Sequence, residues 1–136
     1  MSKLDAFLHP VQVEDTREVI ISRRFLDKDG QPVPFVIRTI TGEENDALRA
    51  SCTKRRREKG MVVDDFNGEL YARKLLAACV AEPDFSDAEL CRAYGTVDPL
   101  EVPGKMLLAG EYNALSRAIS EFNGFSADSE DEAKNS

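Results

Sequence analysis

The stretch LAGEYNALSRAISEFNGF, residues 108–125, decides the fold of this chain. Its apolar residues recur at steps of four, three, four and three, at Leu108, Tyr112, Leu115, Ile119 and Phe122. That spacing places them on one face of an α-helix. Asn123-Gly124 then supplies a left-handed stop. A coiled-coil seam would have the same pattern, but the stripe is short for one. The sequence therefore predicts a long helix with its apolar face in the core.

Three further helices are predicted upstream. Thr41–Glu44 has the form of a capping box, and we expect the helix that it begins to run on through the basic residues Lys54–Lys59. Residues 70–80 carry a broad apolar stripe, which favours a helix at the centre of the core. Ser86–Glu89 is a second capping box, and it predicts a short helix that stops at Gly95.

The segments 19–26 and 33–40 are rich in β-branched residues and flank a turn-forming segment, so they predict a β-hairpin. Both faces carry apolar side chains, and a two-stranded sheet is barely stable alone in water. The hairpin must therefore pack on helices, add a strand from another chain, or do both. We expect an α+β fold, an N-terminal β-hairpin packed on a bundle of about four α-helices. Ile20 and Val36 are predicted partner contacts, and the hairpin edge offers a route to self-association.

The N-terminal segment holds Leu4, Phe7 and Leu8 at the spacing of one side of a short helix, which Pro10 disturbs. This arm either folds onto its own domain or docks on a partner, in which case these three side chains are the contacts. We expect a flexible arm over residues 1–16, a single α+β domain over 17–125, and a disordered acidic tail over 126–136.

The formal net charge is −7, which disfavours nucleic acid as a default partner. The run Lys54-Arg55-Arg56-Arg57 is the exception. At a helix end these cations complement the helix dipole. Alternatively they form a basic patch for an acidic protein or a nucleic acid, with Arg55 and Arg56 as contacts, although no aromatic residue is interleaved to stack on bases.

No catalytic, metal-binding or cofactor-binding constellation is visible. The single histidine, His9, lies beside Pro10 in the arm, and no zinc-binding, dinucleotide-binding or phosphate-loop motif occurs. Cys52, Cys79 and Cys91 lie in apolar patterns, which is typical of small buried residues in a reducing compartment. With no apolar segment long enough to cross a bilayer and no secretion signal, we expect a non-enzymatic cytoplasmic protein without membrane contact.

Five segments occur in an order that resembles the XkdN-like family of phage tail assembly chaperones. They are Phe35-Val36-Ile37-Arg38-Thr39-Ile40-Thr41, Pro83-Asp84, Tyr94-Gly95, Met106-Leu107-Leu108-Ala109-Gly110-Glu111-Tyr112 and Asn123-Gly124-Phe125. The resemblance covers nearly everything from residue 17 to residue 125. It carries no catalytic residues, and the matching positions indicate helix stops, caps and core contacts.

The resemblance implies an assembly factor encoded among phage or prophage tail genes. Such a protein would hold the tape-measure protein in the host cytoplasm while tail-tube proteins assemble around it, and it would be absent from the mature virion. Two alternatives remain open at this point: a small nucleic-acid-binding regulatory protein that uses Lys54–Arg57, and a structural tail component.

Overall fold

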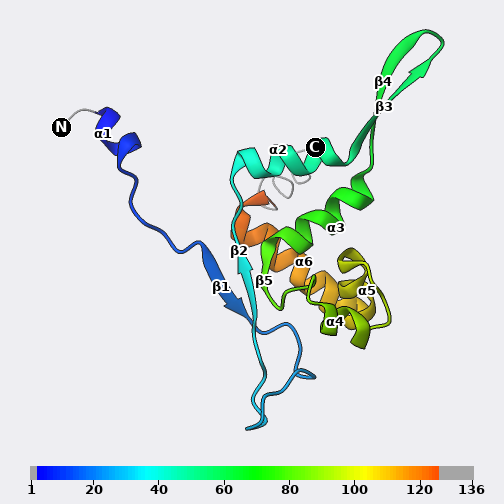
Figure 1. Cartoon of the computed structure of the whole chain (residues 1–136). Coiled ribbons are helices and arrows are strands. Elements are labelled where there is room, and N and C mark those ends of the chain that lie inside the picture. Colours follow the sequence, from blue (N-terminus) through cyan, green and yellow to red (C-terminus); the bar gives the residue numbers. More distant parts are fainter. Residues whose placement is uncertain (1–2, 126–136) are drawn as a thin grey trace, which may run out of the picture.

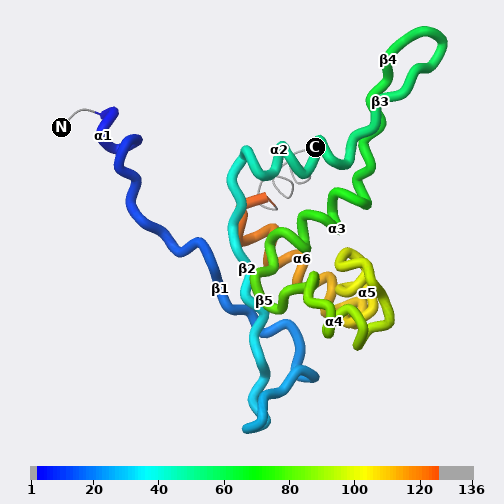
Figure 2. Tube along the Cα trace, in the orientation of Figure 1, coloured from blue at the N-terminus to red at the C-terminus, as the bar shows by residue number. Residues whose placement is uncertain are grey.

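The computed structural model describes residues 3–125, so the predicted acidic tail 126–136 lies outside the described residues. The α-helices are α1 (Lys3–Leu8), α2 (Gly42–Ser51), α3 (Gly68–Cys79), α4 (Ala88–Ala93), α5 (Val102–Met106) and α6 (Ala109–Asn123), and a 3-10 turn covers Pro99–Glu101. The strands are β1 (Thr16–Val19), β2 (Phe35–Arg38), β3 (Thr53–Glu58), β4 (Met61–Phe66) and β5 (Val80–Glu82). Figures 1 and 2 show a helical body with α1 on one side of it and the β3–β4 hairpin projecting on the other.

Helix α6 forms the centre of the body, as its sequence pattern predicts. Leu115 and Ile119 are fully buried, in one cluster with Ile37 of β2 and Leu76 of α3. Leu108 is the exception, because it precedes the first turn of the helix and is exposed. The three cysteines are buried and free, as expected.

A three-stranded antiparallel sheet packs against these helices, in the order β1-β2-β5. Phe35 and Ile37 of the central strand β2 point into the core. The α+β class is confirmed, but the finer picture of a two-stranded hairpin on about four helices is not. Residues 80–82, which directly follow α3, form a third strand. The expected strand over 33–40 is shorter, at Phe35–Arg38, and the one over 19–26 is misplaced, because β1 is Thr16–Val19. Residues 20–34 form an irregular loop in which only Leu26 and Pro32 form a bridge.

Two of the residues that carry the resemblance to XkdN-like chaperones, Arg38 and Asn123, lie where β2, α2, α3 and α6 converge. The guanidinium of Arg38 donates to the carbonyl of Ala78 at 2.7 Å and to the carboxylate of Glu44 at 2.9 Å. The side-chain carbonyl of Asn123 accepts from the amide of Ile40 at 2.9 Å. Its NH₂ group donates to the carbonyls of Arg38 and Ile119. These two polar side chains therefore connect helix ends to the central strand.

The two predicted capping boxes have different outcomes. Thr41 and Glu44 form the predicted box at the start of α2, and this prediction is confirmed. The prediction for Ser86 is wrong, because Asp87 is the N-cap of α4 and accepts from the amides of Glu89 and Leu90. Ser86 instead donates to Asp84 in the preceding turn.

The prediction that α2 continues through the basic residues is also wrong. The helix ends at Ser51, and Thr53–Glu58 forms strand β3, which pairs with β4 over six residues. Residues 61–66 form the second strand of this hairpin. Lys59 and Gly60 have φ of 53° and 79°, so both central residues of the turn are left-handed. That is the twist that joins two antiparallel strands through a two-residue loop.

Candidate partner-binding surfaces

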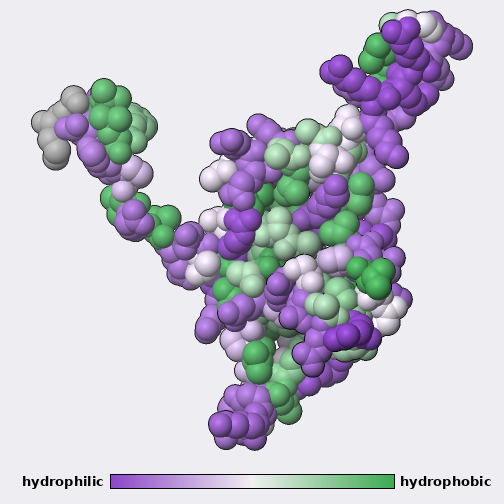
Figure 3. Space-filling view, viewed as in Figure 1, coloured by the Kyte–Doolittle hydropathy of each residue, from purple (hydrophilic) through white to green (hydrophobic). Residues whose placement is uncertain are grey.

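The N-terminal arm presents its apolar residues to solvent. Leu4, Phe7 and Leu8 all lie in α1, and the side chain of Phe7 is 81% exposed. Figure 3 shows these apolar atoms gathered on α1, away from the body. A helix of six residues is marginal in water without tertiary contacts, so α1 has apolar surface to offer to another chain.

Ile20 lies just outside the sheet, whereas Val36 lies on its central strand. Ile20 directly follows β1 and its side chain is 54% exposed. Val36 is half-buried on the central strand, between Glu18 of β1 and Glu82 of β5. Because both neighbours of β2 are already in place, Val36 offers a side chain but no free backbone edge.

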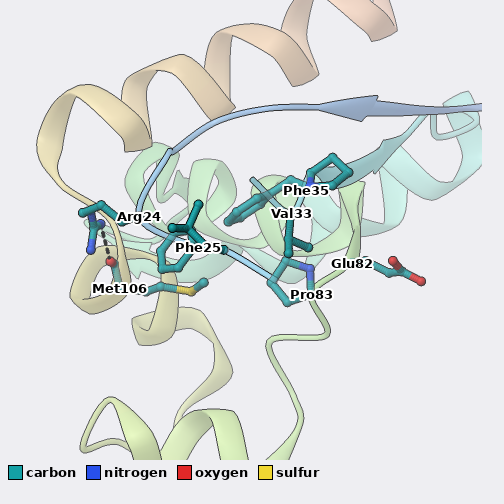
Figure 4. Close-up of a pocket in the computed structure, with 9 residues that line it drawn as sticks. Arg24, Phe25, Val33, Phe35, Glu82, Pro83 and Met106 are labelled. Carbon is teal, nitrogen blue, oxygen red and sulfur yellow. Dashed lines mark hydrogen bonds between the residues drawn. The ribbon is translucent and has the colours of Figure 1, made fainter. Parts of the chain in front are cut away.

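A groove opens beside the sheet, between the 20–34 loop and the segment that follows β5 (Figure 4). Its volume is about 600 Å³. Most of its lining is apolar, and it consists of Arg24, Phe25, Leu26, Val33, Pro34, Phe35, Glu82, Pro83 and Met106. Leu26 and Val33 are exposed, at 53% and 44%. The groove can therefore receive apolar side chains from another molecule.

Arg24 holds one end of this groove in place. Its guanidinium pairs with the carboxylate of Glu111 and donates to the carbonyl of Met106 at 3.1 Å. Arg24, together with hydrogen bonds from Ser22 and from the amide of Leu108, lowers the pKa of Glu111 to about 2. This contact attaches the loop to the start of α6 and fixes the wall of the groove.

The β3–β4 hairpin carries Arg55 and Arg56, which lie among acidic partners. Arg55 pairs with Asp64 at 3.3 Å, directly opposite on β4. Arg56 pairs with Asp65 and, at 2.9 Å, with Glu58. Both arginines are thus partly neutralised within the hairpin itself.

The seven predicted contact residues do not form one site. Leu4, Phe7 and Leu8 lie on the arm, Ile20 and Val36 at the sheet, and Arg55 and Arg56 on the hairpin across the body from the arm (Figure 1).

The groove was missed by sequence reasoning, since its lining comes from four separate segments. A usable signal was the cluster of apolar residues and prolines at 32–35, which is typical of an exposed loop with apolar contacts.

Other kinds of site find no support in the described part of the chain. No group of three or more His, Cys, Asp or Glu side chains within residues 3–125 is placed to hold a metal ion. None of the helices in that range has both the length and the apolar composition needed to span a membrane.

Comparison with known proteins identifies the family. The model of the phage XkdN-like tail assembly chaperone family matches residues 4–134. The chain belongs to the XkdN-like family of phage tail assembly chaperones. It is 41% identical over 132 residues to the phage-like element PBSX protein XkdN of Bacillus subtilis (strain 168), an alignment that covers 92% of this chain and 87% of the relative.

Two further comparisons agree with this assignment. The uncharacterized protein YqbN of Bacillus subtilis (strain 168) is 38% identical over 131 residues, which cover 93% of this chain and 87% of YqbN. The crystal structure of the protein YqbN superposes with a TM-score of 0.72 at 32% identity, over 88% of this chain and 95% of that chain. The fold described above is therefore shared by the relative YqbN.

Proposed function

We propose that this XkdN-like protein is a non-catalytic chaperone that holds the tape-measure protein during tail assembly, in the host cytoplasm. The observation that carries the proposal is the arm, a short amphipathic helix whose apolar face is exposed. Family membership supplies the context of tail assembly. Residues 1–16 would act as the docking arm of a single domain that covers residues 17–125.

The chemistry of the arm suits a helical client. Leu4, Phe7 and Leu8 are spaced three and one residues apart, so they share one face of α1. A helix-in-groove or helix-on-helix contact would bury that face against apolar side chains of the tape-measure protein. Because α1 is marginally stable alone and must be ordered on binding, the entropy cost of ordering it offsets part of the favourable contact energy. The resulting affinity is modest, which allows tail-tube subunits to displace the chaperone.

The apolar groove offers a second contact for the same client. It lies on the body, whereas the arm extends from the body, so one client chain can engage both. Leu26→Lys would place a charge in the groove without changing a buried residue. Val97→Ser is the matched control, since Val97 is 95% exposed and lies outside both surfaces.

Co-expression with the tape-measure protein of the same phage or prophage tests the proposal. We expect the wild-type chaperone and Val97→Ser to keep the tape-measure protein soluble and to be recovered with it in a pulldown, and we expect Leu26→Lys to lower that recovery. If the solubility of the tape-measure protein is the same with and without the chaperone, the proposed function is wrong.

The proposal also distinguishes this protein from a structural tail component. A chaperone leaves the assembly before it is finished, so mass spectrometry of purified virions should detect no peptides of this chain. Stoichiometric recovery in virions would instead assign the protein to the tail itself.

A further inference from the structure

The β3–β4 hairpin has no role in the tail-chaperone proposal above, and it projects from the body with nearly all of its side chains exposed. Residues 54–62 are all exposed on both faces, and β3 and β4 pair only with each other within the described residues. A two-stranded sheet of this kind is barely stable in water and is normally completed by a third strand or a packed helix. Its two outer edges carry unpaired backbone groups that can accept another strand.

The base of the hairpin is firmly attached, so the ribbon is held in a fixed direction. The amide of Asn67 donates to the carbonyl of Cys52 at 2.8 Å, and Cys52 is buried. Phe66 lies against Tyr71, with the guanidinium of Arg49 4.6 Å from the centre of its ring. Beyond this point the ribbon projects into solvent (Figure 1).

The charge of the hairpin is opposite to that of the remaining chain. Residues 53–66 carry five Lys and Arg against three Asp and Glu, in a protein with 18 basic and 25 acidic residues. Four of the five cations are consecutive on β3, whereas β4 carries two of the three carboxylates. An acidic partner strand would be attracted to the outer edge of β3 and repelled by that of β4.

Two of the four cations on β3 have no carboxylate partner in the described structure. Arg55 and Arg56 form ion pairs with Asp64, Asp65 and Glu58, but no ion pair involves Lys54 or Arg57 within residues 3–125. Side chains alternate between the two faces of a strand, so Lys54 lies on one face of β3 and Arg57 on the other. A strand beside β3 that carries carboxylates on both of its faces would meet one unpaired cation on each.

We propose that the outer edge of β3 binds an extended, acidic segment of a partner protein by strand addition. Main-chain hydrogen bonds would provide the part of the contact that does not depend on sequence. Carboxylates placed next to Lys54 and Arg57 would select acidic sequences. Nucleic acid is disfavoured because Glu58, Asp64 and Asp65 lie along the same ribbon. Phe66, the one aromatic side chain of the hairpin, already packs against Tyr71 where the hairpin joins the body, which disfavours stacking on a nucleobase. This inference does not depend on what the arm holds.

Peptides of defined charge test the proposal on the full chain. Fluorescence anisotropy would compare a ten-residue peptide of Thr and Glu in the order Thr-Glu-Glu-Thr, which places Glu on both faces of a strand, with peptides in which Gln or Lys replaces every Glu. We expect the Thr-Glu peptide to bind. We also expect hydrogen exchange to show added protection of amides in β3 and none in the outer edge of β4. Equal binding of the Thr-Glu and Thr-Gln peptides, or protection that maps elsewhere, would overturn the proposal.

Substitutions that leave the ion pairs of the hairpin intact sharpen the test. Lys54→Gln with Arg57→Gln should weaken binding of the Thr-Glu peptide by about three- to tenfold. The control Arg92→Gln with Lys105→Gln removes the same charge from exposed positions on the body. It should change the affinity for the Thr-Glu peptide by less than about twofold. The variant Lys54→Glu with Arg57→Glu should bind the Thr-Lys peptide more tightly than the Thr-Glu peptide. If the charge-reversed variant still prefers the Thr-Glu peptide, the proposed edge is wrong.

Two other occupants are distinguished by the same assay. If duplex DNA of 20 base pairs protects β3 and binds more tightly than the Thr-Glu peptide at equal salt, the ribbon is a nucleic-acid arm and the proposal fails. If the Thr-Glu peptide binds only after residues 126–136 are deleted, the acidic segment of the chain itself is the occupant, and a partner protein is excluded. Binding that is unchanged by this deletion supports the proposal.

Discussion

Asn123 shows how a residue that indicates a helix stop acquires a second role in the structure. Its sequence context, before Gly124, predicts the end of α6, and Gly124 does adopt φ of 79° there. The side chain also bonds to backbone groups of Ile40 and Arg38, which are more than 80 residues away in the chain. Spacing along the sequence cannot reveal this contact, because it depends on where β2 lies relative to α6.

Replacing Asn123 should therefore destabilise the whole domain. In Asn123→Ala the half-buried amide of Ile40 and carbonyl of Arg38 lose their partner, and we expect the free energy of unfolding to fall by about 1–3 kcal/mol. The control is Asn113→Ala, at an exposed position of the same helix. It should change the free energy of unfolding by less than about 0.5 kcal/mol. Chemical denaturation measures both, and an equal effect of the two substitutions would contradict this role.

Glu111 gives a pH-dependent prediction. Its pKa is lowered to about 2 by Arg24, Ser22 and the amide of Leu108, whereas an unfolded Glu titrates near about 4.3. Between these values the unfolded chain binds more protons, so the stabilisation by the ionised carboxylate is lost as the pH falls through this interval.

Glu111→Gln should accordingly be less stable than the wild type near pH 7, with a difference that shrinks as the pH falls from about 5 to about 2. Thermal unfolding across that range measures the difference. Glu121→Gln, at an exposed position of the same helix, controls for the change in net charge. A difference for Glu111→Gln that stays constant down to pH 2 would show that ionisation of Glu111 does not stabilise the fold.

At the scale of elements, amphipathic helices were the most predictable part. The pattern of α6 and the broad stripe of α3 come from local periodicity, and both helices are present with buried apolar faces. Strands were less predictable: β5 covers only three residues after a helix, and its pairing with β2 is a contact between distant segments.

The β3–β4 hairpin was wrongly predicted because Arg, Lys and Glu are also strong helix formers. The run Lys54–Lys59 is compatible with the C-terminal turn of a helix, where cations are favourable, as well as with an exposed strand. A signal for the hairpin is nevertheless present: cations at 54 and 55 and carboxylates at 65 and 64 lie at equal distances from Lys59-Gly60. Opposite charges at equal distances on either side of a Gly-containing turn favour antiparallel pairing of the two flanking segments.

Because no side chain of residues 53–66 is buried, the hairpin should be removable. We expect replacement of residues 54–65 by Asn-Gly, which can form a two-residue turn between Thr53 and Phe66, to change the free energy of unfolding by less than about 1 kcal/mol. Circular dichroism during denaturation would measure this. A loss of several kcal/mol would mean that the ribbon supports the body and is not a separate binding element.

At the scale of the molecule, the arm, the groove and the hairpin lie on separate parts of one small fold. The sequence predicted the apolar character of the arm and the cations of the hairpin, since both are local in the chain. It did not predict the groove, which forms only when the 20–34 loop, β5 and α5 come together. The domain boundaries at residues 16 and 125 stay predictions.

The central claim is that the apolar arm grips the tape-measure protein. The most direct measurement is the affinity of purified tape-measure protein, or of its helical segments, for the wild type and for the variant Phe7→Ser with Leu8→Ser, by isothermal titration calorimetry. Burial of these side chains is worth about 1.5–3 kcal/mol each, so we expect binding at least about tenfold weaker in the variant, with an unchanged melting temperature. Equal affinities of the variant and the wild type for the tape-measure protein would contradict the claim.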